Sequence, residues 1–213
     1  MSVIAVAPSR ITREQLSKAR AEALEYAAYV GSIDMHRAEI DANYRAVAFT
    51  ASERAWLERL DARIEVLAIV ESWCPDVIAT LPVFARISEL APAISLRILP
   101  RPAFREIADA YPDADGRSHI PTYILLDEQE QELGVFIERP DVVDETVLSV
   151  GLRKKAEFQQ RYGDRSPTDI PPTEIEALGA ETLVTRRELR DIERSEIVAW
   201  LERAVAPLLV TQA

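Results

Sequence analysis

Residues 64–78 read IEVLAIVESWCPDVI, and the rest of the fold can be built outward from them. The first seven are a continuous apolar, β-branched run, which is typical of a central strand buried on both faces. Pro75 suits the first position of the helix that follows, because proline lacks the N–H that this position leaves unpaired. Cys74 therefore lies where a buried strand runs into a helix. The apolar side of that helix is marked by Ile78, Leu81, Phe84, Ile87 and Leu90.

The segments that follow complete an α/β pattern. Residues 94–99 (ISLRIL) form a second expected strand, and Pro102 opens a short helix. Two more strands are expected at residues 122–126 and 133–137, joined as a hairpin by the polar stretch DEQEQE. The order β-α-β-α-β-β implies a parallel pair with a right-handed crossover, and the hairpin adds antiparallel strands to the same mixed sheet.

The first sixty residues are expected to be helical. Capping boxes, in which a threonine and the Gln or Glu three residues later cap each other's backbone N–H, begin helices at Thr12 and Thr50. The first of these helices is expected to continue to Gly31. Another helix is expected between residues 33 and 47, where apolar side chains recur at helical spacing.

Helices are also expected after the hairpin. One covers residues 143–162, and a last amphipathic helix covers about 186–208, with the Arg186-Arg187 pair on a solvated face. Between them, the Pro- and Asp-rich stretch GDRSPTDIPP is typical of a linker. These patterns divide the chain into an N-terminal helical extension (1–61), a central domain (62–162), a linker (163–172) and a C-terminal helical extension (173–213).

Composition excludes several classes of function. The 213 residues carry a net charge of −11, which argues against a nucleic-acid binder and against a protein that binds an anionic membrane surface. No apolar run reaches the roughly 20 residues that a membrane-spanning helix needs. The opening MSVIAVAPSRITREQ lacks the basic segment and apolar core of a secretory signal, so we expect a cytoplasmic location.

Cys74 is the one cysteine of the chain, which excludes an internal disulfide and a multi-cysteine zinc site. The two histidines, His36 and His119, lie far from it in the sequence, so we expect no metal site. The chain also lacks the glycine-rich motifs of nucleotide-binding loops and the GxSxG motif of serine hydrolases. Any disulfide that Cys74 forms must therefore join it to another molecule.

Trp73-Cys74, Pro82 and Ile120-Pro121-Thr122, taken in this order, resemble the thioredoxin superfamily. In that family a buried strand leads into Trp-Cys at a helix N-terminus, a proline kinks this helix, and a cis-proline precedes a hairpin. The resemblance covers residues 64–138 and extends to bacterial thioredoxin-like proteins with a helical N-terminus. It implies a three-layer α/β fold with a central mixed sheet, here with added N- and C-terminal helices.

Two positions depart from the thioredoxin pattern. The family's Cys-Gly-Pro-Cys is Cys74-Pro75-Asp76-Val77 here, so the second thiol is replaced by valine. The buried carboxylate that thioredoxins carry six residues before the first cysteine is Ala68. Both departures argue against ordinary dithiol exchange.

The resemblance gives Cys74 the role of a nucleophile. Unpaired N–H groups and the helix dipole are expected to lower the thiol pKa, although Asp76 repels a thiolate. Without a second cysteine, the expected mechanism is monothiol: Cys74 attacks a protein disulfide or thiol adduct, and an external low-molecular-weight thiol such as glutathione resolves the product. No bound cofactor is expected. The alternative is that Cys74 is an ordinary half-buried thiol.

The resemblance also implies a groove for an extended substrate. A cis peptide before Pro121 would leave the Ile120 backbone free to pair with such a chain. Asp76 and His119 are the candidate assisting groups, and the alternative for His119 is a solvated surface residue. The expected substrate-binding residues are Trp73, Pro75, Ile120, Pro121 and Thr122.

Two functions therefore remain open. One is a thioredoxin-like monothiol redox protein that acts on protein disulfides or thiol adducts. The other is a binding module that kept the fold without the chemistry and holds a partner in the Pro121 groove or with its helical arms. These arms are expected either to cover the sheet or to form a homodimer contact.

Overall fold

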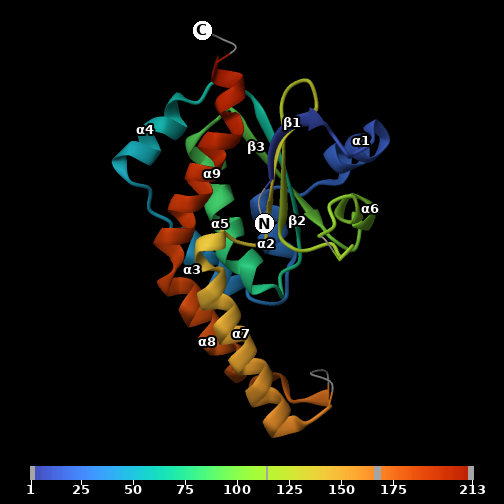
Figure 1. Ribbon diagram of the computed structural model, residues 1–213, viewed down its shortest axis with the longest axis vertical. Coiled ribbons are helices and arrows are strands. Elements are labelled where there is room, and N and C mark those ends of the chain that lie inside the picture. The colour runs from blue at the N-terminus through green and yellow to red at the C-terminus, as the bar shows by residue number, and fades with distance from the viewer. Residues whose placement is uncertain (1–2, 114, 166–168, 211–213) are drawn as a thin grey trace.

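A five-stranded mixed sheet forms the centre of the molecule, in the order β1-β5-β4-β2-β3 (Figure 1). β2 (Ile64–Val70) and β3 (Ile94–Pro100) are parallel. β4 (Thr122–Leu126) pairs antiparallel with β2 and with β5 (Gln131–Ile137). The strands expected from the central pattern, and the mixed sheet that they imply, are thus confirmed.

β1 (Val3–Pro8) is a strand at the edge of this sheet, where the sequence pattern predicts helix. It pairs antiparallel with β5, so the expectation of a wholly helical N-terminus is wrong at these residues. The pairing partner lies more than a hundred residues further along the chain, and a local pattern carries no sign of it. The computed structural model describes residues 3–113, 115–165 and 169–210.

Helices cover both faces of the sheet, which gives the expected three layers (Figure 1). α5 (Pro75–Leu90) and α9 (Arg190–Val210) lie on one face. α1 (Arg13–Glu22) and α6 (Arg105–Asp109) lie on the other. The expected helix beginning at Pro102 is shorter than predicted, because residues 101–104 form turns before α6.

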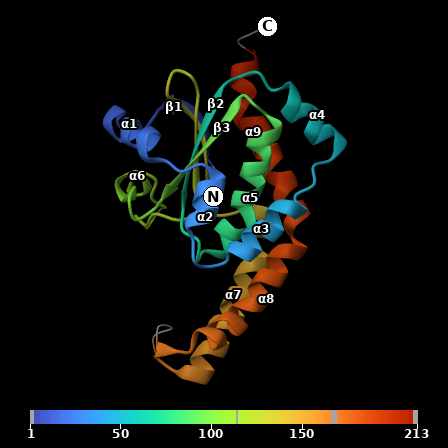
Figure 2. The same cartoon turned by 180° about the vertical axis from the view of Figure 1, so that it is seen from behind.

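The helix expected from Thr12 to Gly31 is interrupted. α1 ends at Glu22 and α2 (Tyr26–Ser32) follows it, because Leu24 exchanges two backbone hydrogen bonds of 2.9 Å with Ile98 of β3. The capping boxes at Thr12 and Thr50 are both confirmed. The next two helices, α3 (Arg37–Ala46) and α4 (Ala51–Arg59), pack against α5 on its side of the sheet (Figure 2).

The C-terminal part holds more helix than the sequence pattern predicts. α7 (Asp141–Tyr162) agrees with expectation, but α8 (Pro172–Glu188) precedes α9, so the single helix expected over 186–208 is wrong at its start. α7 and α8 form a hairpin that projects from the body (Figure 2). Part of the predicted linker, residues 166–168, lies outside the described residues, and the domain boundaries stay predictions. None of the described helices has the length and apolar character needed to cross a membrane.

An aromatic stack joins the sheet to the helices on one face. The rings of Phe84 and Tyr123 lie 3.8 Å apart between centroids, and Phe136 contacts both of them. Trp200 of α9 meets Phe136 edge-on at 5.3 Å. The Tyr123 hydroxyl shares a 2.8 Å hydrogen bond with Thr80, so this buried polar group is paired. The stack makes α9 part of the same core as β4, β5 and α5.

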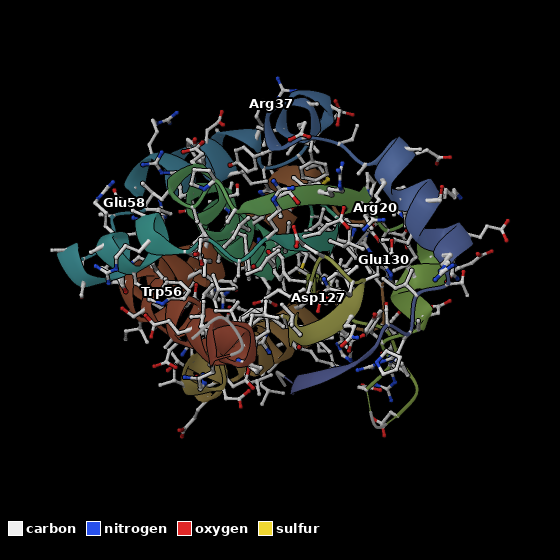
Figure 3. All side chains as sticks on the ribbon, turned by 90° about the horizontal axis from the view of Figure 1, so that it is seen from above. Arg20, Arg37, Trp56, Glu58, Asp127 and Glu130 are labelled. Carbon is white, nitrogen blue, oxygen red and sulfur yellow. The ribbon has the colours of Figure 1, made fainter. Side chains whose placement is uncertain are left out.

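Arg20 joins α1 to the end of the sheet. Its guanidinium lies 2.7 Å from Glu65 of β2 and 2.6 Å from Glu130 of the β4–β5 turn. Figure 3, which looks at the molecule from above, shows Arg20 and Glu130 close together. Because exposed ion pairs contribute little stability, this cluster orients α1 more than it holds the fold together.

Candidate functional site

The site is built where β2 meets α5. Cys74 is the N-cap residue of α5 in an extended conformation, and Pro75 occupies the first turn as the sequence predicts. The Cys74 carbonyl accepts the backbone N–H of Ile78 at 3.1 Å, which closes the first helical turn. The backbone thus fixes the sulfur at the N-terminal end of α5.

A cis peptide bond lies directly beside this sulfur. Ile120–Pro121 is cis, as predicted. The Cys74 thiol donates a hydrogen bond to the Ile120 carbonyl oxygen, with 3.4 Å between sulfur and oxygen. Thr122, at the start of β4, donates from its hydroxyl to the His119 carbonyl at 2.8 Å. The fold therefore brings together the cysteine and the proline loop that the sequence analysis had paired.

The thiol itself is buried and protonated. Cys74 is 6% exposed, and burial is the main cause that raises its pKa to about 11. The charge of Asp76 raises the pKa further, whereas the backbone N–H groups of Asp76 and Val77 lower it. The expected helix N-terminus effect is present, but it is outweighed. The prediction of a lowered thiol pKa is therefore wrong.

Tyr29 of α2 helps to explain this burial. Its side chain is 3% exposed, and it lies near enough to Glu71 and Cys74 for their charges to raise the pKa of its phenol. α2 precedes β2 in the chain and lies outside the strands and helices that carry the motif. α2 thus contributes a wall to the site, which the sequence pattern around Cys74 does not reveal.

Asp76 is held in a buried network of charges and does not face an open site. Its carboxylate lies 2.7 Å from Arg139, which follows β5, and 3.2 Å from Arg186 of α8. Arg186 in turn lies 2.7 Å from Glu193 of α9. Arg186 is 3% exposed, so its expected place on a solvated helix face is wrong, whereas Arg187 is exposed.

Burial raises the pKa of both carboxylates in this network, to about 7 for Glu193, against the opposing effect of the guanidinium groups. In this structure the Asp76 carboxylate joins the first turn of α5 to Arg139 and to Arg186 of α8. Sequence reasoning missed Arg139, Arg186 and Glu193 as its partners. The one signal available in the sequence was the charge of Asp76 within an apolar segment, and this signal does not indicate which residues pair with it.

His119 lies beside the cis peptide between two carboxylates. Its Nε2 is 2.7 Å from Asp113 and its Nδ1 is 3.1 Å from Glu138. The hydrogen bond that the imidazole donates to the Asp113 carboxylate is the main cause that raises the pKa of His119, and the same bond lowers the pKa of Asp113 to about 2. The imidazole is thus paired with two carboxylates at a half-buried position, and its assisting role stays a prediction.

The predicted substrate-binding residues differ in exposure. Trp73 is 51% exposed, and its indole N–H donates to the Glu71 carboxylate. Pro75 is half-buried, whereas Ile120, Pro121 and Thr122 are buried. The exposed surface at the site is therefore formed by Trp73. In the described part of the chain, no group of His, Cys, Asp and Glu side chains is arranged to hold a metal ion.

Comparison with known proteins agrees with this geometry. A sequence model of the family described as Thioredoxin matches residues 23–159, well over half of the chain. The chain belongs to the thioredoxin family. The family match begins before α2 and continues into α7, so it reaches beyond the strands and helices that carried the resemblance. No curated protein matches this thioredoxin-family chain.

Two crystal structures share the fold. One is a protein of unknown function from Pseudomonas aeruginosa, 23% identical, with a TM-score of 0.52 over 81% of this chain and 96% of that one. The other is an HIV epitope-scaffold, 21% identical, with a TM-score of 0.55 over 87% of this chain and 96% of that one. At these identities the likeness concerns the thioredoxin fold alone.

Proposed function

We propose that this thioredoxin-family protein is a binding module that holds a partner protein beside Trp73 and keeps Cys74 as a protonated, structural thiol. The observation that carries the proposal is the buried Cys74 S–H, which donates to the Ile120 carbonyl across 3.4 Å. This bond uses the proton that a nucleophile would have to lose. It therefore stabilises the thiol rather than the thiolate.

The ionisation of Cys74 supports the same conclusion. With the pKa of Cys74 at about 11, only about one molecule in 10⁴ carries a thiolate at pH 7. Val77 stands where a second thiol would resolve a mixed disulfide, and it is fully buried. The group that meets solvent at this end of α5 is the Trp73 indole, a side-chain type that is enriched at protein interfaces.

The test is the pH dependence of Cys74 alkylation by iodoacetamide in the native protein. We expect slow reaction below pH 9 and a rise only towards pH 11, while the urea-unfolded chain reacts with the pKa near 8.5 of an ordinary cysteine. Fast alkylation of the native protein at pH 7, with an inflection below pH 8, would overturn the proposal.

A second candidate function is monothiol exchange, and the N-cap position of Cys74 favours it. Backbone N–H groups of Asp76 and Val77 act to lower the pKa of the thiol, and the cis peptide lies beside the sulfur. In this reaction the Cys74 thiolate attacks one sulfur of a substrate disulfide and releases the other as a thiolate. An external thiolate such as glutathione then attacks the substrate sulfur of the mixed disulfide, forms a new disulfide with it and releases Cys74 as a thiolate.

The two candidates give different products with oxidised glutathione. Monothiol exchange predicts a glutathione adduct on native Cys74 within minutes at pH 7.5, visible by intact-mass spectrometry and reversed by reduced glutathione. The binding module predicts no adduct on the native protein and a complete adduct once the chain is unfolded.

A further inference from the structure

A hollow of about 420 Å³ lies beside Trp73, outside the carboxyl ends of the parallel strands β2 and β3. Crevices at this end of parallel strands are common ligand sites in α/β proteins. One wall comes from the turn after β2 and from Pro100 and Pro102 after β3. The rest of the lining comes from α2 and the loop after it, through Tyr29, Ser32, Ile33, Asp34 and Met35.

Two large apolar side chains stand exposed on the walls of this hollow. Trp73 is 51% exposed and Met35 is 54% exposed, and they come from different segments of the chain. Trp, Tyr and Met are enriched in the cores of protein interfaces, and methionine adapts its shape to a bound surface. The composition of the hollow therefore suits a protein segment.

A buried polar atom at the hollow is unpaired. The Tyr29 side chain is 3% exposed, and its hydroxyl has no hydrogen-bond partner among the described residues. An unpaired buried hydroxyl is costly, so such groups normally find a partner. This hydroxyl has essentially no accessible surface, so it lies behind the wall of the hollow and does not itself meet an occupant.

The charges on the walls favour a basic occupant. Of the described residues that line the hollow, the charged ones are Glu71 and Asp34, and both are acidic. Arg101 lies 3.8 Å from Glu71 and offsets part of its charge, whereas Asp34 is exposed at the rim. The chain as a whole carries a net charge of −11, which disfavours a second copy of itself as the occupant.

We propose that this hollow binds an extended segment of a partner protein that carries a bulky apolar side chain next to a lysine or arginine. The apolar side chain contacts Trp73 and Met35, and the basic side chain meets Asp34 and Glu71. The inference rests on the proposed function, because it names the partner chemistry of the surface beside the structural thiol. It also gives the N-terminal extension a role, since α2 and its loop form half of the hollow.

The test uses a phage-displayed library of random twelve-residue peptides, panned on the full-length chain. We expect the enriched peptides to combine an aromatic or aliphatic residue with an adjacent Lys or Arg. A synthetic copy of the leading peptide is then titrated by fluorescence anisotropy. Met35→Glu and Trp73→Ser should each weaken its binding at least tenfold, and Asp34→Lys should weaken it by a similar factor.

Leu152→Glu is the matched control, because Leu152 is 68% exposed on α7, away from the hollow, and should leave the affinity unchanged. Circular dichroism of each variant is the check that it is folded. Failure to enrich any peptide, enrichment of acidic peptides, or binding that is indifferent to Met35→Glu would each overturn the inference. The proposed function is decided separately by Cys74 alkylation, so a reactive thiol and an empty hollow are distinguishable results.

Discussion

The protonation of Cys74 depends on a carboxylate two residues along the chain. Burial is the main cause that raises the pKa of the thiol, and the Asp76 charge is the next. We therefore predict that Asp76→Asn lowers the pKa of Cys74 and speeds its alkylation at pH 9. Asparagine keeps an oxygen that can accept from Arg139, which lies 2.7 Å from the native carboxylate, so the first turn of α5 remains anchored.

The control for this change is Asp61→Asn, at an exposed position after α4, which should leave the alkylation profile as it is. If Asp76→Asn is folded and its profile matches that of the native protein, burial alone sets the pKa of the thiol. The test separates the desolvation of the sulfur from the repulsion between two neighbouring charges.

His119 makes the loop before the cis peptide sensitive to pH. Its hydrogen bonds to Asp113 and Glu138 raise its pKa above the ordinary value of about 6.5. A raised histidine pKa stabilises the fold fully below about pH 6.5, and this stabilisation is lost as pH rises through the folded-state pKa. His119→Gln should therefore lower the free energy of unfolding in urea at pH 6 by less than about 1 kcal/mol and change it little at pH 9.

The pKa of His119 can be read independently by NMR titration of its imidazole protons. Asp113→Asn removes the larger of the two causes and should lower the pKa of His119. An unchanged titration in that variant would show that the 2.7 Å contact does not control the imidazole.

At the scale of elements, α5, α8 and α9 are joined by buried charge. Arg186 lies between Asp76 of α5 and Glu193 of α9, at 3.2 and 2.7 Å. Its removal takes from the buried Glu193 the guanidinium that pairs with it and leaves Asp76 with Arg139, and breaking a buried ion pair is among the costlier single changes. We predict that Arg186→Met lowers the free energy of unfolding at pH 8 by about 3 kcal/mol.

The loss of unfolding free energy caused by Arg186→Met should be smaller at pH 5. Burial already raises the pKa of Glu193 to about 7, and without the guanidinium both carboxylates take up protons more readily. Since protonated carboxyl groups tolerate burial better, the variant regains stability as pH falls. Arg187→Met, at the next residue and on the exposed face, is the control. Its free energy of unfolding should stay within about 0.5 kcal/mol of that of the native protein at both pH values.

The elements that local sequence predicts are those whose pattern is set by their own residues. β2 is apolar throughout because both of its faces are buried, and the Thr50 box defines the start of α4 by itself. The break at Leu24 and the strand β1 could not be predicted in this way. Both arise from pairing with strands far along the chain, and the local sequence does not encode the partner.

For the whole molecule, the motif predicts neighbours but not their environment. The sequence analysis placed Cys74 beside Pro121, and the fold brings them together. The burial of the thiol follows from side chains that arrive from elsewhere, such as Tyr29 from the N-terminal extension. These parts of the chain bury the sulfur, and burial raises the pKa of the thiol against the lowering expected from its position at a helix N-terminus.

The packing of α9 on the sheet decides whether the C-terminal helices fold separately or as one unit with the rest of the chain. Trp200 of α9 is 3% exposed and packs against Phe136 of β5. Trp200→Ala should therefore lower the free energy of unfolding by about 3–5 kcal/mol. We expect a single urea transition when unfolding is followed by circular dichroism and by tyrosine fluorescence. Trp56→Ala on α4, where the ring is only partly buried, should cost less. Two separate transitions, with the sheet unaffected by Trp200→Ala, would mean that α9 folds apart from the domain it covers.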